Sequence, residues 1–231
     1  MRTRGMIAVA TLALSATVLT GCGFAGLGVA TDEKTESYEV TDKVVQLTVR
    51  SGAGDVVVNE SDRAGIKVTE KMHWRDTAPQ ASHPVKGEVL ELSYDCDKAL
   101  DSCWIDYTID VPKALKVKVD MGAGDITLRS LSGEIEVKTG AGDIGASGLA
   151  GKRLSAETGA GELDLKFGGA PDSVEAQTGA GDATLHLPQG RYDVTTDSGV
   201  GSTVVKVTDD ASAPRKVSVS SGVGEVKILP Q

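Results

Sequence analysis

Apolar and polar positions alternate along much of the chain, and the alternation is organised around short glycine-containing stretches. Before Gly122-Ala123-Gly124-Asp125, the residues Val117, Val119 and Met121 are separated by polar residues. After it, the alternation resumes from Ile126 to Leu128. A period of two is typical of a strand with one buried face. The pattern therefore predicts two half-buried strands that meet at a glycine corner.

The corner occurs seven times. Its first glycine is residue 52, 122, 140, 159, 179, 199 or 222, so that after a first gap of 70 residues the spacing is 18 to 23. Glycine suits a corner where neighbouring backbones approach closely. A repeat of about 20 residues is the signature of a solenoid, whose coils are stable only against their neighbours. We therefore predict an all-β fold, a parallel β-solenoid (β-helix) of about 20-residue coils with Gly-Ala-Gly-Asp corners. The corner residues are Gly52, Gly54 and Asp55; Gly122, Gly124 and Asp125; Gly140, Gly142 and Asp143; Gly159, Gly161 and Glu162; Gly179, Gly181 and Asp182; Gly199 and Gly201; and Gly222, Gly224 and Glu225.

The acidic residue of each corner has two interpretations. A ladder of carboxylates is one way to bind calcium, as in shorter glycine- and aspartate-rich repeats. Alternatively, each aspartate accepts hydrogen bonds from backbone N–H groups of its own corner. Glu162, Glu225 and Ser202 stand in this position in three corners, and such variation does not fit a uniform calcium geometry. We therefore favour capping and expect no metal site and no cofactor.

The segment from about residue 59 to 113 interrupts the repeat. Residues 66–74, 89–94 and 104–111 are expected to form strands, and the loop 75–86, which contains two prolines, is expected to be irregular. The segment is interpreted either as degenerate coils or as an elaborated cap on the open end of the core. Together with the repeats it forms the predicted domain, residues 38–231.

Four of the eight aromatic residues lie in this interrupting segment. Trp74, Trp104 and Tyr107 are the candidate ligand contacts, because aromatic side chains stack on sugars and anchor protein partners. The alternative is that they only shield the end of the core.

The N-terminus has the features of an export signal. A basic start at residues 1–4 precedes an apolar run at residues 6–19, which is short for a membrane span. Leu19-Thr20-Gly21-Cys22 resembles the lipobox of bacterial lipoproteins. We therefore expect a signal peptide at residues 1–21, acyl chains on Cys22, and a flexible tether over residues 22–37. An ordinary export signal with a chance cysteine is the alternative. The lipoprotein interpretation predicts attachment at the extracytoplasmic face of the bacterial cell membrane.

Export would change the net charge of the protein and would permit its cysteines to pair. Removing Arg2 and Arg4 with the signal takes the net charge from −9 to −11, which disfavours nucleic-acid binding. An extracytoplasmic location permits disulfides. Cys96 and Cys103 are the two cysteines that remain besides Cys22, and we expect them to pair, the alternative being two free buried thiols.

The sequence offers no convincing active site. Residues 140–145 match the dinucleotide fingerprint G-x-G-x-x-G, but no helix is expected to follow. Asp197-Ser198-Gly199 is similar to the sequence around a serine-protease nucleophile, but Ser198 occupies a corner position that other repeats fill with Thr or Ser. His73, His83 and His186 show neither metal spacing nor pairing with an acid. We therefore expect a protein that is not an enzyme.

Taken together, three features resemble the bacterial putative-adhesin lipoprotein family of unknown function (domain of unknown function 4097 type). They are the lipobox-like end of the signal, the Cys96/Cys103 pair followed by Trp104-Ile105-Asp106-Tyr107 and Val111-Pro112, and the Gly-Ala-Gly-Asp coils. The resemblance covers about residues 38–229, implies a β-solenoid of the cell envelope, and brings no catalytic residues.

These observations lead to three functional hypotheses. The first is a lipid-anchored surface module, adhesin-like or structural, whose partners are the membrane through the acyl chains on Cys22 and a cell-wall polymer or an envelope protein. The second is an accessory protein-binding component of an envelope signalling system. The third, a polysaccharide-active enzyme, is disfavoured because no clustered carboxylates are evident from the spacing.

Overall fold

A computed structural model describes residues 32–96 and 102–231. The predicted signal peptide, Cys22 and the first part of the predicted tether lie outside these residues. The described residues form strands and turns without a helix, which confirms the all-β prediction. Accordingly, the described part of the chain has no helix that could cross a membrane.

The strands form two facing sheets. The first sheet has the order β1 (Asp32–Val40), β4 (Ile66–Trp74), β8 (Cys103–Val111), β3 (Val56–Glu60), β10 (Ile126–Arg129), β12 (Ile144–Leu149), β14 (Leu163–Phe167), β16 (Ala183–Leu187), β21 (Val226–Pro230), β18 (Thr203–Val205). The second has the order β19 (Thr208–Asp209), β17 (Arg191–Val200), β20 (Lys216–Val223), β15 (Ser173–Ala180), β13 (Arg153–Ala160), β11 (Ile135–Ala141), β9 (Lys116–Ala123), β2 (Gln46–Ala53), β7 (Val89–Asp95), β5 (Gln80–Ser82), and β6 (Val85–Lys86) also pairs with β7.

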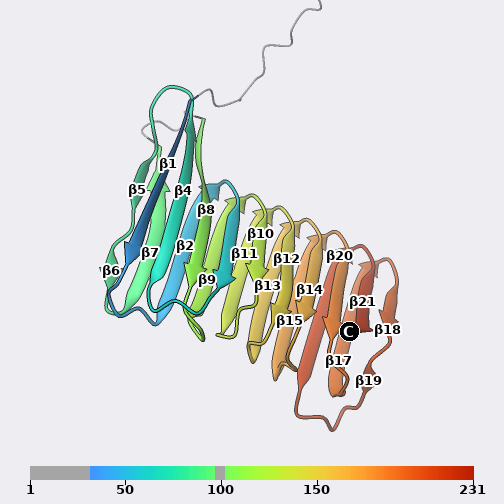
Figure 1. Ribbon diagram of the computed structural model, residues 1–231. Helices are drawn as coiled ribbons and strands as arrows, with labels where there is room; N and C mark the ends of the chain where they lie inside the picture. Colours follow the sequence, from blue (N-terminus) through green and yellow to red (C-terminus); the bar gives the residue numbers. More distant parts are fainter. Residues whose placement is uncertain (1–31, 97–101) are drawn as a thin grey trace, which may run out of the picture.

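Between β9 and β16 the chain passes from the second sheet to the first at each glycine corner and returns through a looser turn (Figure 1). The pairing is parallel and in register, so that Val117 lies beside Ile135 and Ile135 beside Leu154. Every second side chain enters the space between the sheets, where the aliphatic residues are almost completely buried. Each such side chain contributes roughly 1.5–3 kcal/mol of burial free energy. This layered parallel arrangement is the one expected of a β-solenoid.

The corners show why glycine recurs. Gly142 has a φ of 141°, and a Cβ atom there would lie within 3.0 Å of the carbonyl oxygen of Gly124 in the adjacent unit. The same carbonyl oxygen accepts a hydrogen bond from the Thr139 hydroxyl at 3.1 Å. Both the backbone conformation and the close stacking therefore exclude a side chain at this position.

The order of the units differs from the sequence order at both ends. A repeat of about 20 residues predicts coils that follow one another in chain order, but β20 and β21 lie between β15/β16 and β17/β18. Likewise, β2 and β3 lie between β7/β8 and β9/β10. The inward positions of the inserted strands carry fully buried residues such as Val219 and Ile228, whereas the end unit carries the partly or fully exposed Thr196 and Thr203. The apolar unit is thus covered on both sides, and the more polar unit closes the end.

The opposite end is an ordered cap. The strands expected at residues 66–74, 89–94 and 104–111 are β4, β7 and β8, whereas the loop 75–86, which was expected to be irregular, contains the short strands β5 and β6. Strand β4 pairs antiparallel with β1 and β8, and the upper parts of these three strands rise above the row of corners (Figure 1). Residues 32–37, which were included in the predicted tether, form most of β1. Cross-strand contacts such as Lys71–Glu33 at 3.0 Å hold them against β4.

Candidate functional site

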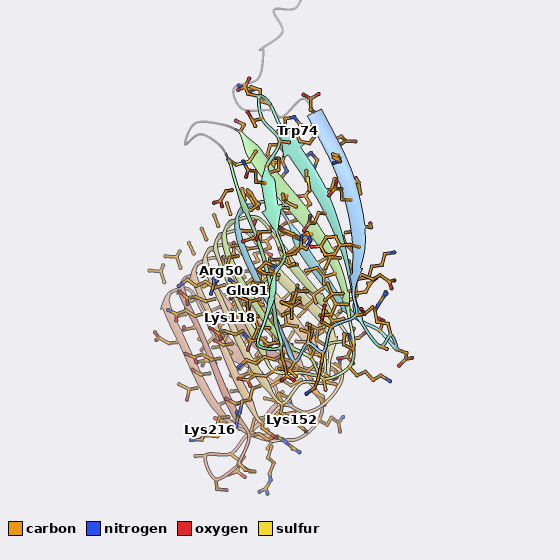
Figure 2. All side chains as sticks on the ribbon, turned by 90° about the vertical axis from the view of Figure 1, so that its left-hand side faces the viewer. Arg50, Trp74, Glu91, Lys118, Lys152 and Lys216 are labelled. Carbon is orange, nitrogen blue, oxygen red and sulfur yellow. A yellow bond between two sulfur atoms is a disulfide. The ribbon has the colours of Figure 1, made fainter. Side chains whose placement is uncertain are left out.

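The three aromatic candidates do not form one surface. Tyr107 points between the sheets and is 1% exposed. Trp104 is half-buried on the outward side of β8, where its ring stacks on His73 with 4.9 Å between the ring centroids. Trp74 packs against the core near the top of β4 (Figure 2). An aromatic platform built from all three residues is therefore not present.

The stacked His73 has an acidic partner. Its Nε2 atom lies 3.0 Å from Oδ2 of Asp106, and the two side chains are only 15% and 35% exposed. The expectation that the histidines lack an acid was therefore wrong for His73. The other oxygen of Asp106 accepts a hydrogen bond from the backbone N–H of Asp55 at 2.9 Å. Asp106 thus orients the imidazole and also supports the first corner.

Asp106 begins a ladder that runs along the corners. The carboxylate of one unit accepts the backbone N–H of the acidic residue in the next unit: Asp55 from Asp125 at 3.0 Å, Asp125 from Asp143 at 2.8 Å, Asp143 from Glu162 at 2.7 Å, and Asp182 from Glu225 at 2.8 Å. Capping is therefore correct in kind but not in direction, because each aspartate caps its neighbour's corner instead of its own. No group of three potential metal ligands occurs in residues 32–96 and 102–231.

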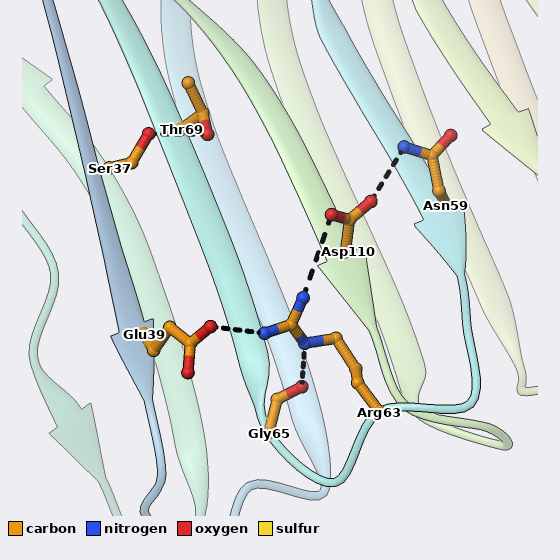
Figure 3. A network of polar contacts seen from close by, with 7 residues as sticks. All are labelled: Ser37, Glu39, Asn59, Arg63, Gly65, Thr69 and Asp110. Atoms are coloured by element: carbon orange, nitrogen blue, oxygen red, sulfur yellow. Dashed lines mark hydrogen bonds and ion pairs between the residues drawn. The ribbon is translucent and has the colours of Figure 1, made fainter.

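A polar network fastens the cap to the repeats (Figure 3). The Arg63 guanidinium donates to Glu39 in β1 at 2.7 Å and to the carbonyl oxygen of Gly65 at 2.9 Å. It also lies 3.9 Å from Asp110 in β8, which accepts a hydrogen bond from Asn59 in β3 at 3.1 Å. Within the first sheet, Arg63 therefore links the edge strand β1 to β8, the second strand from it.

The outward face of the second sheet carries residues in register. Toward the cap these residues form ion pairs, such as Lys118–Glu136 at 2.6 Å and Lys138–Glu157 at 2.9 Å. Exposed pairs of this kind contribute little to stability, typically about 0–1 kcal/mol. Toward β17 the face mixes hydroxyl and amide side chains with charged ones such as Glu175, Asp193 and Asp197. We call Ser155, Gln177, Thr195, Ser218 and Ser220 the hydroxyl face.

A buried acid lies inside the cap, and the sequence analysis missed it. Glu70 is 1% exposed, and one of its oxygens accepts a hydrogen bond from the Tyr38 hydroxyl at 2.7 Å. The other oxygen has no hydrogen-bond partner, and neither does the hydroxyl of Tyr107. Burial raises the pKa of both the Glu70 carboxyl and the Tyr107 phenol. The signal was present, since Glu70 occupies an apolar position in the alternation of Ile66 and Val68.

An open groove lies next to this acid. It has a volume of about 490 Å³ and lies at the edge between the two sheets. Its lining residues are Tyr38, Glu39, Val40, Thr41, Asp42, His83 and Val85. The ring of Tyr38 stacks on His83 with 4.3 Å between centroids, so that these two residues separate the groove from Glu70.

Comparison with solved structures supports this fold in one case. One solved structure, described as a putative cell adhesion protein from Clostridium sporogenes, aligns with a TM-score of 0.54 at 17% identity, covering 87% of this chain and 100% of that one. A second, described as a putative adhesin from Bacteroides fragilis, aligns with a TM-score of 0.46 at 18% identity, covering 88% and 100%. A search of curated protein sequences finds no match.

The family comparison is more specific. The sequence model of the Toastrack family, DUF4097, matches residues 99–229, which is more than half of the chain. The matched region includes β8 and the parallel units from β9 to β21. The chain therefore belongs to the Toastrack family.

Proposed function

We propose that the protein is a non-catalytic, adhesin-like binding module at the bacterial cell surface, attached through acyl chains on Cys22. In this proposal the body is a β-solenoid of about 20-residue coils whose Gly-Ala-Gly-Asp corners keep the outward side chains in register. The fold that it shares with a protein described as a putative cell adhesion protein is consistent with this role.

The hydroxyl face is the observation that carries the proposal. Parallel pairing places Gln177 beside Ser220, and Ser218 beside Thr195. Neighbouring strands lie about 4.8 Å apart, so these side chains form regular rows of hydrogen-bond donors and acceptors. A shallow groove of about 310 Å³ crosses the same face and is lined in part by Thr195 and Ser218, with Glu175, Asp193 and Lys216 as its charged residues. Such a surface suits an extended polymer rich in hydroxyl groups, and we propose cell-wall polysaccharide as the ligand.

The test uses the mature chain with Cys22→Ser, in which the Cys96–Cys103 disulfide that the structure contains is kept oxidised. The chain is mixed with purified wall polysaccharide and with washed envelopes. We expect saturable retention that soluble polysaccharide fragments abolish by competition. The double substitution Ser218→Glu and Thr195→Glu should weaken retention at least tenfold, because it adds charge and removes donors within the groove. The matched control is Thr184→Glu, on the outward face of the first sheet, which should bind normally.

Retention of the double variant at the level of the parent would contradict the hydroxyl face as the binding surface. Retention on envelopes that protease treatment abolishes, without retention on polysaccharide, would instead identify a protein partner. That result would favour the accessory role in envelope signalling.

The anchor is tested independently in cells that express the full chain. We expect radiolabelled palmitate to be incorporated into the parent protein and not into Cys22→Ala, which should be released from the membrane fraction. Equal labelling of the two chains would exclude acylation at Cys22.

A further inference from the structure

The interior of the cap contains two polar groups that the protein itself leaves unpaired. Glu70 and Tyr107 are register partners on the adjacent strands β4 and β8, and each is 1% exposed. One Glu70 oxygen and the Tyr107 hydroxyl lack any hydrogen-bond partner. Leaving a buried polar group without a hydrogen-bond partner is unfavourable. Two such groups side by side in an otherwise apolar core therefore indicate a place for a third molecule.

The route to this place is short. Tyr38 donates its hydroxyl to Glu70, and its ring stacks on His83 and lines the open groove. Tyr38 is in the edge strand β1 of the first sheet, and His83 lies between β5 and β6 at the edge of the second. The two rings thus meet across the gap between the sheets. For a guest in the groove to reach the Glu70 carboxylate, the ring of Tyr38 would have to rotate away from it.

The chemistry of the groove favours a positively charged guest. Glu39, Asp42 and His83 line it and no lysine or arginine does; Glu39 is paired with Arg63, whereas Asp42 forms no ion pair within the described residues. The nearby cations are already engaged, Arg63 with Glu39 at 2.7 Å and Lys43 with Glu88 at 2.6 Å. An ionised carboxylate accepts hydrogen bonds and cannot donate them, and the faces of tyrosine rings attract cations.

From this geometry we propose that the gap between β1 and β5/β6 binds a compact alkylammonium group. The group passes the Tyr38–His83 stack, pairs with the free oxygen of Glu70 and donates to the Tyr107 hydroxyl. A charge-assisted hydrogen bond to a buried carboxylate is about twice as strong as a neutral one. Lysine-type side chains of peptides and amino sugars both carry such a group. The proposal adds a ligand class to the surface module and rests on the proposed function only for its biological setting.

The experiment uses the mature Cys22→Ser chain, labelled with ¹⁵N, and three probes at pH 7.5. The probes are Nα-acetyl-lysine methylamide, glucosamine, and the Nε-acetylated form of the lysine probe as a neutral counterpart. We expect saturable chemical-shift changes at Tyr38, His83 and β4 with one or both cationic probes and none with the neutral one. Which cationic probe binds distinguishes a peptide source from an amino-sugar source.

Two variants test the role of the buried pair. Glu70→Gln should weaken binding at least tenfold and Tyr107→Phe several-fold, while the exposed control Glu157→Gln should bind like the parent. Shift dispersion in the same spectra shows whether each variant is folded. Equal binding of the neutral probe, unchanged binding in folded Glu70→Gln, or no saturable change at the groove would each overturn the proposal and leave an internal water as the partner of both groups.

Retention on wall polysaccharide is measured on the same Glu70→Gln chain. If Glu70→Gln loses amine binding but is still retained on polysaccharide, the loss concerns the cap alone. If the parent binds the amine but is not retained on polysaccharide, only the polysaccharide proposal is refuted.

Discussion

Replacing Gly142 by alanine is expected to lower the free energy of unfolding by at least about 3 kcal/mol or to prevent folding. The new Cβ atom would lie within 3.0 Å of the Gly124 carbonyl oxygen, and the φ of 141° is one that side-chain-bearing residues rarely adopt. The backbone cannot withdraw easily, because the Gly142 N–H donates to Ala160 at 2.9 Å on the other side. The substitution therefore acts against both neighbouring units at once.

Gly145→Ala is the matched control, three residues away. A Cβ atom at Gly145 would have no other atom within 4 Å, and its φ is not in the positive range. We expect a change within about 0.5 kcal/mol, as for surface substitutions in general. Urea denaturation followed by circular dichroism measures both variants. Equal stability of Gly142→Ala and Gly145→Ala would contradict the close stacking of the corners.

The second large effect is expected at Glu70, as a change in how stability depends on pH. Burial raises the pKa of this carboxyl in the folded state above its ordinary value of 4.5. Between the ordinary and the raised pKa the folded state holds the proton more tightly than the unfolded state does. The free energy of unfolding therefore falls as the pH rises through this window, and the loss is complete above the folded-state pKa. We expect Glu70→Gln to remove this fall and to be more stable than the parent at pH 8 by about 1 kcal/mol, of the order of the cost of an unpaired buried group.

Urea denaturation at intervals from pH 4.5 to pH 8.5 measures this difference. Glu175→Gln serves as the control, since Glu175 is exposed on the second sheet and its removal should leave the pH profile unchanged. Parallel profiles for the parent and Glu70→Gln would show that Glu70 has no raised pKa. A parent that gains stability with rising pH in this window, relative to Glu70→Gln, would reverse the proposed sign.

Most strands could be predicted from the sequence, because alternation reports directly which face of a strand is buried. The predicted strand 66–74 coincides with β4, and 104–111 lies within one residue of β8. The order of the strands could not be predicted in the same way, because every corner has similar residues and fits beside any other. The polarity of Thr196 and Thr203 at inward positions was the available signal for an end unit.

The candidate sites were less predictable for a physical reason. The pairing of His73 with Asp106 depends on the antiparallel alignment of β4 with β8, and nothing local to either residue indicates that partner. Glu70 is different, since a single acid at an inward position between Val68 and Met72 already indicates a buried carboxyl. The direction of the aspartate ladder required the stacking distance between units, which spacing along the chain does not contain.

The insertion of β20/β21 between β15/β16 and β17/β18 has a consequence for how the molecule is completed. In a solenoid that grows in chain order, loss of the C-terminal strands would shorten the body by one unit and leave the rest intact. Here residues 216–230, which follow β17/β18 in the chain, form an inner unit, so the body closes only after they have been synthesised. Until then, the strands of β17/β18 lack the neighbour on which their pairing depends. A protease that removed residues 216–230 would therefore open a gap within the structure instead of shortening it at one end.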